Sequence, residues 1–353
     1  MTKSRAERFL ENFFKEAYIT AEPETFLNRL ELIVKDAQQP TSDNNKRSRS
    51  ANSQLLSIPN RGIPNTGNTC YIASVIQCLI RYPGFVNALN TNLYPSDEFT
   101  QQFRSLIYAY LSSYVVDVTA FANVLPRIGS FQVNLQEDAS QLLMSISNNL
   151  SGGLGTHLKK LTSFEERTII TNCPNCNYQA TPPPEISSGF LSVSLLNQEA
   201  TVSRTLLNHY APKNFVGECG SGRSSCGQVT RKEHRCMRSL PEVLVIHLKR
   251  FEVQGERQVT LKKNNTQILV EEFIDVKAFK CEPSNESHPY ELFAVINHEG
   301  KINNGHYSAM CRTSEGWKTF NCGTVTNFNP QFEYRSMSPY LLFYKKRRVS
   351  ITA

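Results

Sequence analysis

The order of the periodic segments along the chain restricts its fold more than any other feature. After residue 60, apolar residues first recur at helical spacing, and we expect helices over 71–80, 99–115, 120–125 and 137–150. The second half contains short runs rich in β-branched residues, and we expect strands over 243–251, 291–298, 306–312 and 340–344. Helices first and strands later indicate an α+β fold rather than alternating βαβ units.

Charge is concentrated in two short basic runs. The 38 basic and 31 acidic residues leave a net charge of +7, which the runs 46–49 and 345–348 account for by themselves. We expect each run to be a solvated linker or tail, with a weak localisation signal or an acidic partner as the alternative, and we expect no nucleic-acid-binding face. Hydrophobic residues make up 40% of the 353-residue chain, enough for a large core, but no apolar run is long enough to predict a membrane span.

The N-terminal region differs in composition from the rest of the chain. Residues 5–19 and 23–37 each carry an amphipathic stripe, so we expect residues 1–40 to form a helical hairpin, either a docked extension or a partner-binding module. Residues 41–60 are rich in Ser, Asn, Lys and Arg and predict a flexible linker. The sequence begins without the apolar core of a secretory signal, so we expect the ten cysteines in a reducing compartment, the cytoplasm and/or the nucleus.

Cys70 occupies the most informative position in the sequence. It follows a turn-rich segment and opens an apolar helix, where Asn68 or Thr69 can cap the N-terminus. The positive end of the helix dipole favours the thiolate and predicts a lowered pKa for Cys70. Asn65, five residues earlier, can donate to an oxyanion beside the backbone N–H of Cys70. The alternative is a buried, inert cysteine, which is the interpretation we adopt for Cys78 further along the same helix.

A second segment adds a base and a residue to orient it. Residues 293–321 predict a strand, a Gly/Asn-rich loop and a β-hairpin, with His306 at the start of the strand that follows the loop. A histidine beside a loop is well placed to act as an exposed base. Asn321, at the end of the neighbouring hairpin strand, can lie beside the ring and fix its orientation. Cysteine, histidine and asparagine form a known nucleophile–base–orienter arrangement.

These two segments resemble the signature boxes of the ubiquitin-specific protease family of cysteine deubiquitinases. The first box corresponds to Gly62–Tyr71, and the second to Gly305–Tyr307 with Trp317–Asn321. Three further family motifs occur in family order, at Gln136–Leu143, Leu240–Phe251 and Tyr340–Tyr344. The resemblance extends from residue 62 to residue 344, about 80% of the chain.

The resemblance implies a papain-like cysteine peptidase fold with thumb, palm and fingers. It implies a catalytic domain at residues 61–345, with fingers at about 165–240, followed by a basic C-terminal tail at 346–353. Residues 1–60 are not covered by the resemblance. The hairpin expected there is therefore an extension of unassigned role, with partner binding as one possibility.

The resemblance also implies a role for each residue of the proposed site. Cys70 would be the nucleophile, His306 the general base and then the acid, and Asn321 the orienting residue. Asn65 would complete the oxyanion hole, and catalysis would need no cofactor. Cys322 occupies a position where the family often has a second acid, so orientation would rest on Asn321 alone and we expect modest turnover.

The implied substrate is folded ubiquitin, whose flexible Gly-Gly tail would enter a narrow channel. Gly305 would pack over the tail, Asp138 would contact its basic residues, and Tyr307 is either a further substrate contact or a core aromatic residue. Gln141 stands where the family often has Glu, so a protease for another modifier such as SUMO or NEDD8 is an alternative. Further alternatives are a catalytically weak ubiquitin-binding scaffold and a zinc-ribbon module. We expect ubiquitin or ubiquitinated proteins as partners, and neither nucleic acid nor membrane.

Four cysteines in the implied fingers suit a structural zinc site, which the family carries in that region. They form two pairs, Cys173 with Cys176 and Cys219 with Cys226. Six residues separate the second pair, more than the usual two to four. Glycines between them can let the wider loop close, or another residue can replace one ligand. The candidate replacements are His209, His234 and Cys236, the last of which is otherwise expected in the core. The alternative is a set of free thiols.

Overall fold

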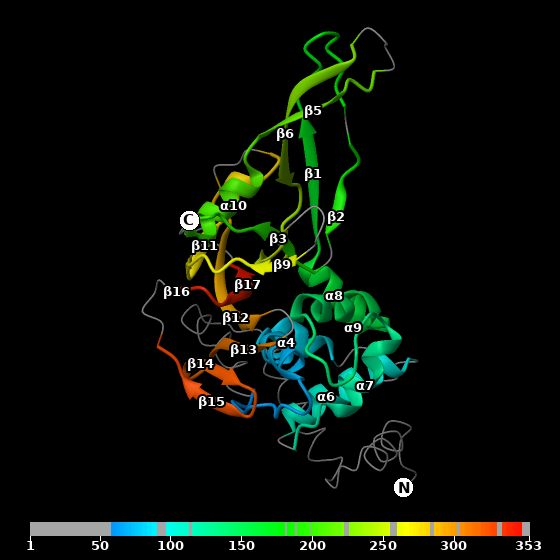
Figure 1. The fold of residues 1–353 in the computed structure, drawn as a ribbon. Helices are drawn as coiled ribbons and strands as arrows, with labels where there is room; N and C mark the ends of the chain where they lie inside the picture. The colour runs from blue at the N-terminus through cyan, green and yellow to red at the C-terminus, as the bar shows by residue number, and fades with distance from the viewer. Residues whose placement is uncertain are drawn as a thin grey trace, which may run out of the picture. The chain divides into compact units, whose positions relative to one another are not determined.

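The computed structural model describes eleven stretches of the chain. These are residues 58–89, 97–112, 115–180, 182–187, 189–198, 200–221, 226–254, 260–282, 286–301, 304–329 and 334–347. The hairpin expected at 1–40 and nearly all of the linker expected at 41–60 lie outside them. The chain divides into two compact units: unit 1 takes residues up to His157 and Tyr307–Asn329, and unit 2 takes Leu158–His306 and the residues from 330 onward. Unit 1 contains most of the helices and unit 2 most of the strands (Figure 1), as the expected α+β class requires.

Unit 1 is built around a buried helix. Helix α4 (Cys70–Ile80) buries all of its side chains and packs against α8 (Ala139–Asn149), as a helix that is apolar on every face must. The other helices of the unit are α5 (Pro83–Ala88), α6 (Glu98–Leu111), α7 (Thr119–Val124) and the short helix η1 (Leu125–Arg127). Between α6 and α7, the ring of Phe121 contacts the rings of Phe99 and Phe103.

Three antiparallel strands complete unit 1. β13 (Asn304–Thr313) begins in unit 2 and continues into unit 1, where it pairs with β14 (Gly316–Asn321), which in turn pairs with β15 (Thr324–Asn327). Ala309 lies opposite Phe320, so β14 ends at Asn321 beside the first unit 1 residues of β13. Helix α4 also packs against β14. The helix that starts at Cys70 and the hairpin strand that ends at Asn321 therefore belong to one packed structure.

Unit 2 contains a largely antiparallel sheet with a buried centre. Its neighbouring strands are β12 (Pro289–Lys301), β17 (Pro339–Lys346), β7 (Val243–Lys249) and β3 (Leu191–Ser194), and β11 (Phe273–Asp275) pairs with β12. β3 runs parallel to β7. The first six residues of β17 are buried, which explains why residues 340–344 form a continuous apolar run.

Smaller elements surround this sheet. They are β4 (Ala200–Thr201), β10 (Ile268–Val270) and β16 (Tyr334–Ser336), which form a second sheet, the hairpin β8 (Phe251–Gln254) and β9 (Thr260–Lys263), and the short helix η2 (Lys277–Phe279). Helix α10 (Val202–Tyr210) packs on β3 and β10. The side chain of Thr201 caps α10 by accepting a hydrogen bond from the N–H of Arg204.

Four strands form an extended arm within unit 2 (Figure 1). They lie in the order β2 (Glu185–Ser187), β1 (Phe164–Ile170), β6 (Gln228–Met237) and β5 (Lys213–Glu218). Five of the six residues of β5 are exposed. The arm occupies the part of the chain where fingers are expected. Because much of its surface is exposed, the arm can bury only a small apolar core of its own.

The expected helices and strands are confirmed, with shifts of a few residues at their ends. Three α-helices were missed: α5, α9 (Gly152–Thr162) and α10. Three glycines lower the helix propensity of α9, and α10 lies in a region where strands were expected. β17 continues to Lys346, whose N–H bonds to the carbonyl of Glu242, so the basic run begins inside a strand.

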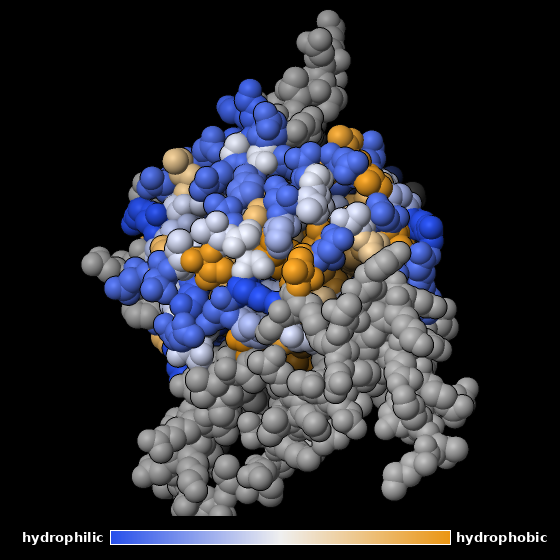
Figure 2. Space-filling model, turned by 90° about the horizontal axis from the view of Figure 1, so that it is seen from below, coloured by the Kyte–Doolittle hydropathy of each residue, from blue (hydrophilic) through white to orange (hydrophobic). Residues whose placement is uncertain are grey.

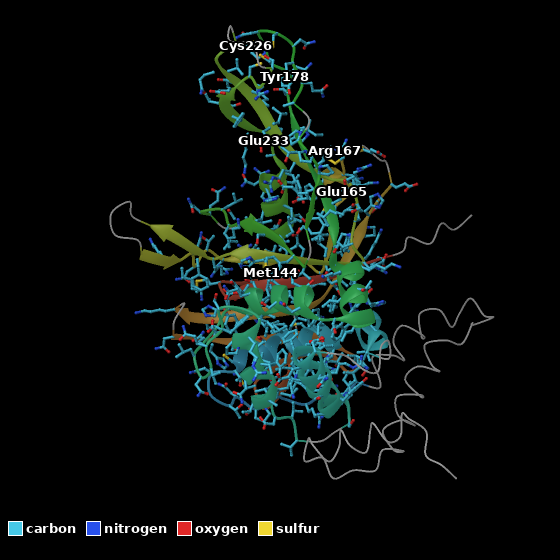
Figure 3. The ribbon with its side chains drawn as sticks, turned by 90° about the vertical axis from the view of Figure 1, so that its right-hand side faces the viewer. Met144, Glu165, Arg167, Tyr178, Cys226 and Glu233 are labelled. Carbon is cyan, nitrogen blue, oxygen red and sulfur yellow. A yellow bond between two sulfur atoms is a disulfide. The ribbon has the colours of Figure 1, made fainter. Side chains whose placement is uncertain are left out.

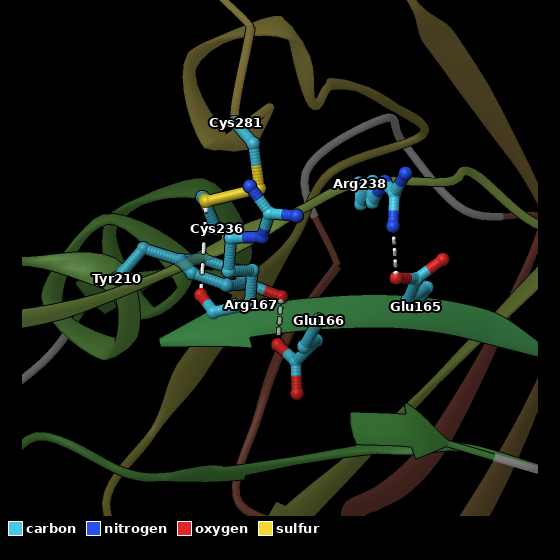
Figure 4. The surroundings of a disulfide bond; sticks show 7 residues. All are labelled: Glu165, Glu166, Arg167, Tyr210, Cys236, Arg238 and Cys281. Carbon is cyan, nitrogen blue, oxygen red and sulfur yellow. Dashed lines mark hydrogen bonds and ion pairs between the residues drawn. A yellow bond between two sulfur atoms is a disulfide. The ribbon is translucent and has the colours of Figure 1, made fainter. Parts of the chain in front are cut away.

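A disulfide joins Cys236 of β6 to Cys281, which no sequence pattern predicted (Figure 4). Cys236 is 4% exposed, so its expected burial is confirmed, but its partner lies 45 residues away in sequence. The N–H of Cys281 bonds to the carbonyl of Met237, and this bond brings the two chain segments together. Beside the disulfide, the hydroxyl of Tyr210 donates to the buried carboxylate of Glu166 at 2.7 Å.

The surface seen in Figure 2 is mostly hydrophilic, with small separate apolar patches. Most of the large apolar side chains of the described residues lie in the core instead. Within the described stretches, no helix is both long and apolar enough to cross a bilayer.

Candidate active site

In the loop before α4, Asn65 and Asn68 make hydrogen bonds that differ from those expected from the sequence. The carboxamide oxygen of Asn65 accepts hydrogen bonds from the N–H and the hydroxyl of Thr69, at 2.7 and 3.3 Å. Neither Asn68 nor Thr69 caps the helix with its side chain, so that expectation was wrong. Asn68 adopts the left-handed conformation (φ 66°) and donates to the carbonyl of Asn134 instead. With its oxygen engaged, Asn65 has its NH2 end left to donate.

Cys70 is the first residue of α4 and is 3% exposed. Burial raises the pKa of its thiol, and hydrogen bonds from the main chain of Tyr307, Tyr71 and Cys70 itself lower it by less, so the net shift is upward. The lowered pKa expected from the helix dipole was therefore wrong. At neutral pH a thiol in this environment holds its proton and needs a base to remove it.

Tyr307 connects the nucleophile to the second signature segment. Its main chain hydrogen-bonds to the sulfur of Cys70, and its side chain is buried with 3% exposure. The buried ring favours the core interpretation of Tyr307 over a contact with substrate through the side chain. His306, the preceding residue in the chain, is half-buried.

The turn after Asn321 lies against the segment before Cys70. Asn321 is exposed at the end of β14, and Cys322 follows it with a positive φ of 49°. The carbonyl of Cys322 accepts a hydrogen bond from the N–H of Ile63 at 2.8 Å. A β-carbon added to Gly62 would come 2.3 Å from that carbonyl oxygen, so only glycine fits there. Burial, followed by the charge of Cys70, raises the pKa of Cys322 to about 11.

Two expected substrate contacts have clear local partners. Asp138 is the N-cap of α8, where its carboxylate accepts hydrogen bonds from the N–H groups of Ser140 and Gln141 at 2.6 and 3.1 Å. This capping role was not expected from the sequence, although an Asp directly before a helix is typical of an N-cap. In unit 2, Gly305 lies against the ring of His298: a β-carbon added to Gly305 would come 2.3 Å from Nε2 of His298.

The four cysteines of the arm come together in unit 2. The sulfur atoms of Cys173, Cys176, Cys219 and Cys226 all lie within 4.8 Å of one another, and the sulfurs of Cys176 and Cys219 are 3.4 Å apart. Three of these residues are buried. Figure 3 shows Cys226 with Tyr178 at one end of the arm. His209, His234 and Cys236 are not members of this cluster.

Strand register explains why the wide spacing of the second pair is tolerated. β5 and β6 are antiparallel, and their last pair is Glu218 with Gln228. Cys219 and Cys226 therefore flank the end of one hairpin, where the N–H of Cys219 bonds to the carbonyl of Gly227. The first pair closes through a local turn, in which the N–H of Cys173 bonds to the carbonyl of Tyr178.

The thiols of the cluster have opposed pKa shifts. A hydrogen bond with Ser221 lowers the pKa of Cys219 to about 6, whereas hydrogen bonding with Cys176, followed by burial, raises the pKa of Cys226 to about 12. Four thiolates this close would repel one another strongly without a cation. Four cysteine sulfurs are the ligand set of a closed, structural zinc site, so the cluster could bind one zinc ion.

Comparisons with known proteins identify the family. A sequence profile described as "Ubiquitin carboxyl-terminal hydrolase" matches residues 61–344. Ubiquitin carboxyl-terminal hydrolase 8 of Saccharomyces cerevisiae is 25% identical over 352 residues, which cover 82% of this chain and 71% of that protein. Ubiquitin carboxyl-terminal hydrolase 21 of Arabidopsis thaliana is 27% identical over 315 residues, 81% of this chain but only 42% of that protein.

A solved structure supports the fold. The SAGA Ubp8/Sgf11/Sus1/Sgf73 DUB module bound to ubiquitin aldehyde matches with a TM-score of 0.65 at 21% identity, over 83% of this chain and 71% of that chain. The expected ubiquitin-specific protease fold is thereby confirmed. Since the profile covers well over half of the residues, the chain belongs to the ubiquitin carboxyl-terminal hydrolase family, in its cysteine-type, ubiquitin-specific protease branch.

Proposed function

We propose that this protein is a thiol-dependent deubiquitinase that hydrolyses the isopeptide or peptide bond after the C-terminal Gly of ubiquitin. One observation carries the proposal. The main chain of Tyr307 hydrogen-bonds to the thiol of Cys70, and His306 is the next residue in the chain. The contact between Ile63 and Cys322 adds support, because Asn321 directly precedes Cys322.

The raised pKa of Cys70 determines the first step. His306 takes the thiol proton while the sulfur attacks the carbonyl carbon of the terminal Gly, and the carbonyl electron pair moves onto oxygen. The N–H of Cys70 and the NH2 of Asn65 donate to this oxyanion. The C–N bond then breaks, and the leaving amine takes the proton from the imidazolium. Water, deprotonated by His306, cleaves the thioester and releases Cys70, while Asn321 keeps the imidazole in position.

Substrate recognition is assigned to three positions. Gly305 would pack over the tail of ubiquitin, and the ring of His298 leaves no room for a side chain at this position. Tyr307 would contribute through its main chain. Asp138 fixes the N-terminus of α8 by capping it, and its carboxylate is the acidic contact for the basic tail. Gln141 stands where the family often has Glu, so cleavage of ubiquitin should be compared with cleavage of SUMO and NEDD8.

A zinc ion held by Cys173, Cys176, Cys219 and Cys226 is the proposed cofactor. It would cross-link the two hairpin ends of the arm and would take no part in bond cleavage. Metal analysis of purified protein tests the assignment, with about one zinc per chain expected in the wild type and none in Cys173→Ala. A wild type without zinc would refute it.

Electrophilic probes test the deubiquitinase proposal directly. Ubiquitin, SUMO and NEDD8 carrying the same C-terminal electrophile are incubated with the protein, and the labelled peptide is identified by mass spectrometry. We expect labelling at Cys70 by the ubiquitin probe. Labelling by SUMO or NEDD8 alone would indicate a protease for another modifier, and binding without labelling would indicate a ubiquitin-binding scaffold.

The cellular setting is part of the same proposal. The partners would be ubiquitin or ubiquitinated proteins, and the matched DUB module is itself bound to ubiquitin aldehyde. We propose a cytoplasmic and/or nuclear location, which imaging of the tagged protein would test.

A further inference from the structure

The end of β12 is held by a lysine from a different hairpin of unit 2. Lys263 is the last residue of β9. Its ammonium group donates to the carbonyl of His298 at 2.8 Å and to the carbonyl of Gly300 at 3.2 Å. Two of its three donors are thus used on main-chain oxygens of one strand end. Burial, assisted by the charge of Arg250, lowers the pKa of Lys263.

The same strand end supports the residue before His306. The side chain of His298 is fully buried, with its ring 5.3 Å from the ring of Phe251 at a steep angle. Gly305 rests against this ring so closely that a β-carbon would come 2.3 Å from Nε2. His298 therefore touches the main chain one residue before the proposed general base.

The backbone next to Lys263 is in turn held by Arg250. Arg250 is fully buried and donates to the carbonyls of Asn264 and Thr266 at 2.9 and 3.0 Å, and to the carbonyl of Pro339 at 2.6 Å. Because Asn264 directly follows Lys263, these hydrogen bonds from Arg250 also fix the backbone next to the lysine. Arg250 and Phe251 belong to the family motif Leu240–Phe251, which has no role in the reaction steps proposed above.

We propose that Lys263 is a positioning residue for His306. Lys263 fixes His298 and Gly300, His298 in turn supports Gly305, and Gly305 leads directly into His306. A general base must be held close to its productive position, within hydrogen-bond reach of the group whose proton it takes, and a displacement of about 1 Å by a remote mutation can cost about 10²-fold in rate. The inference rests on the proposed function, because it concerns the base of that reaction.

Paired variants of neighbouring lysines test the role. Lys263→Met removes the donors, whereas Lys262→Met is a matched control, because Lys262 is exposed on the same strand. Hydrolysis of a fluorogenic ubiquitin conjugate gives kcat and KM, and iodoacetamide alkylation of Cys70 without substrate reports how well His306 accepts the thiol proton. For Lys263→Met we expect kcat to fall about 10- to 100-fold with KM within about twofold, and alkylation at neutral pH to slow in parallel. Lys262→Met should match the wild type, and Lys263→Arg should recover part of kcat.

Each other outcome rejects the positioning role. A higher KM at unchanged kcat would make Lys263 a contact for ubiquitin, and unchanged kinetics would make it dispensable. If Lys263→Met does not fold, the same measurements on Lys263→Ser, whose short side chain cannot reach the carbonyls of His298 and Gly300, take its place, and full activity there would overturn the proposal. A wild type that neither cleaves ubiquitin nor is labelled by the probe would instead refute the proposed function.

Discussion

Cys70 and the four cysteines of the arm meet opposite electrostatic conditions. Cys70 is a single buried thiol whose pKa is raised, so its ionisation depends on a base that takes the proton. In the arm, four sulfurs lie within 4.8 Å, so their ionisation depends on a cation that offsets their repulsion. The comparison teaches that the neighbours of a thiol, rather than its place at a turn or a helix start, decide its chemistry.

The surroundings of the two sites differ in the same way. Cys70 opens a helix whose side chains are all buried, so the core of unit 1 holds it in place. The cluster lies at one end of an arm in which β5 is largely exposed. A cross-link through a metal can substitute there for the missing core. Four predictions test how independent the two sites are.

The largest effect is expected from removing the nucleophile. Cys70→Ala should lower kcat/KM for a ubiquitin conjugate by about 10⁴-fold or more, because no other group can form the thioester. The melting temperature and the zinc content should stay close to those of the wild type. Cys322→Ser is the control and should retain most of the activity. Comparable losses in the two variants would contradict the assignment.

The next effect concerns the pH dependence of Cys70. Burial raises the pKa of Cys70 above its ordinary value of 9.0, and His306→Ala removes the imidazole proposed to take the thiol proton. The thiolate fraction then increases as the pH rises toward and beyond that value. Alkylation of Cys70 in His306→Ala should therefore be about 10²-fold slower than in the wild type at pH 7, with the difference shrinking at high pH. Superimposable pH profiles would show that His306 does not act on this thiol.

Metal removal should affect the arm more than the chemistry. Chelation, or the variant Cys226→Ser, should lower the free energy of unfolding by about 3 kcal/mol, the effect of losing a ligand present at about 100 times its Kd. Iodoacetamide alkylation of Cys70 should change by less than about twofold, because the thiol belongs to the other unit. Thermal melts and alkylation rates measured on the same samples check this. A parallel loss of both would show that the two sites are coupled.

The smallest effect is expected at the base of the arm. Tyr210→Phe leaves the buried carboxylate of Glu166 without the hydroxyl that donates to it, at a cost of about 2 kcal/mol. Urea unfolding should detect this loss, while zinc content and cleavage stay unchanged. Tyr178→Phe, at the exposed end of the arm, is the control. Loss of zinc in Tyr210→Phe would mean that the base of the arm determines the geometry of the cluster.

Local patterns predicted much of the fold and the site. Cys70 at the start of α4 and Asn321 at the end of β14 follow from periodicity and turn residues that lie close together in sequence. The pKa of Cys70 was predicted in the wrong direction, because the burial that raises it comes from packing against other elements. The acceptor role of Asn65 depends on its rotamer, which no sequence pattern specifies.

Long-range pairing accounts for most of the remaining differences. The spacing of Cys219 and Cys226 looked too wide, but the register of β5 with β6 brings the two residues together. The disulfide between Cys236 and Cys281 requires the chain near Lys280 to meet β6, which it does through a bridge between Lys280 and Met237. Neither pairing can be read from the residues next to the cysteines.

From the tight approach at Gly62 we expect a temperature-sensitive variant. In Gly62→Ala, the added methyl carbon would come 2.3 Å from the carbonyl oxygen of Cys322, so the loop before Cys70 and the turn after Asn321 would have to move apart. We expect such a chain to assemble in cells grown cold and to lose activity when they are warmed. One methyl group would then make the activity temperature-sensitive without changing any reacting atom.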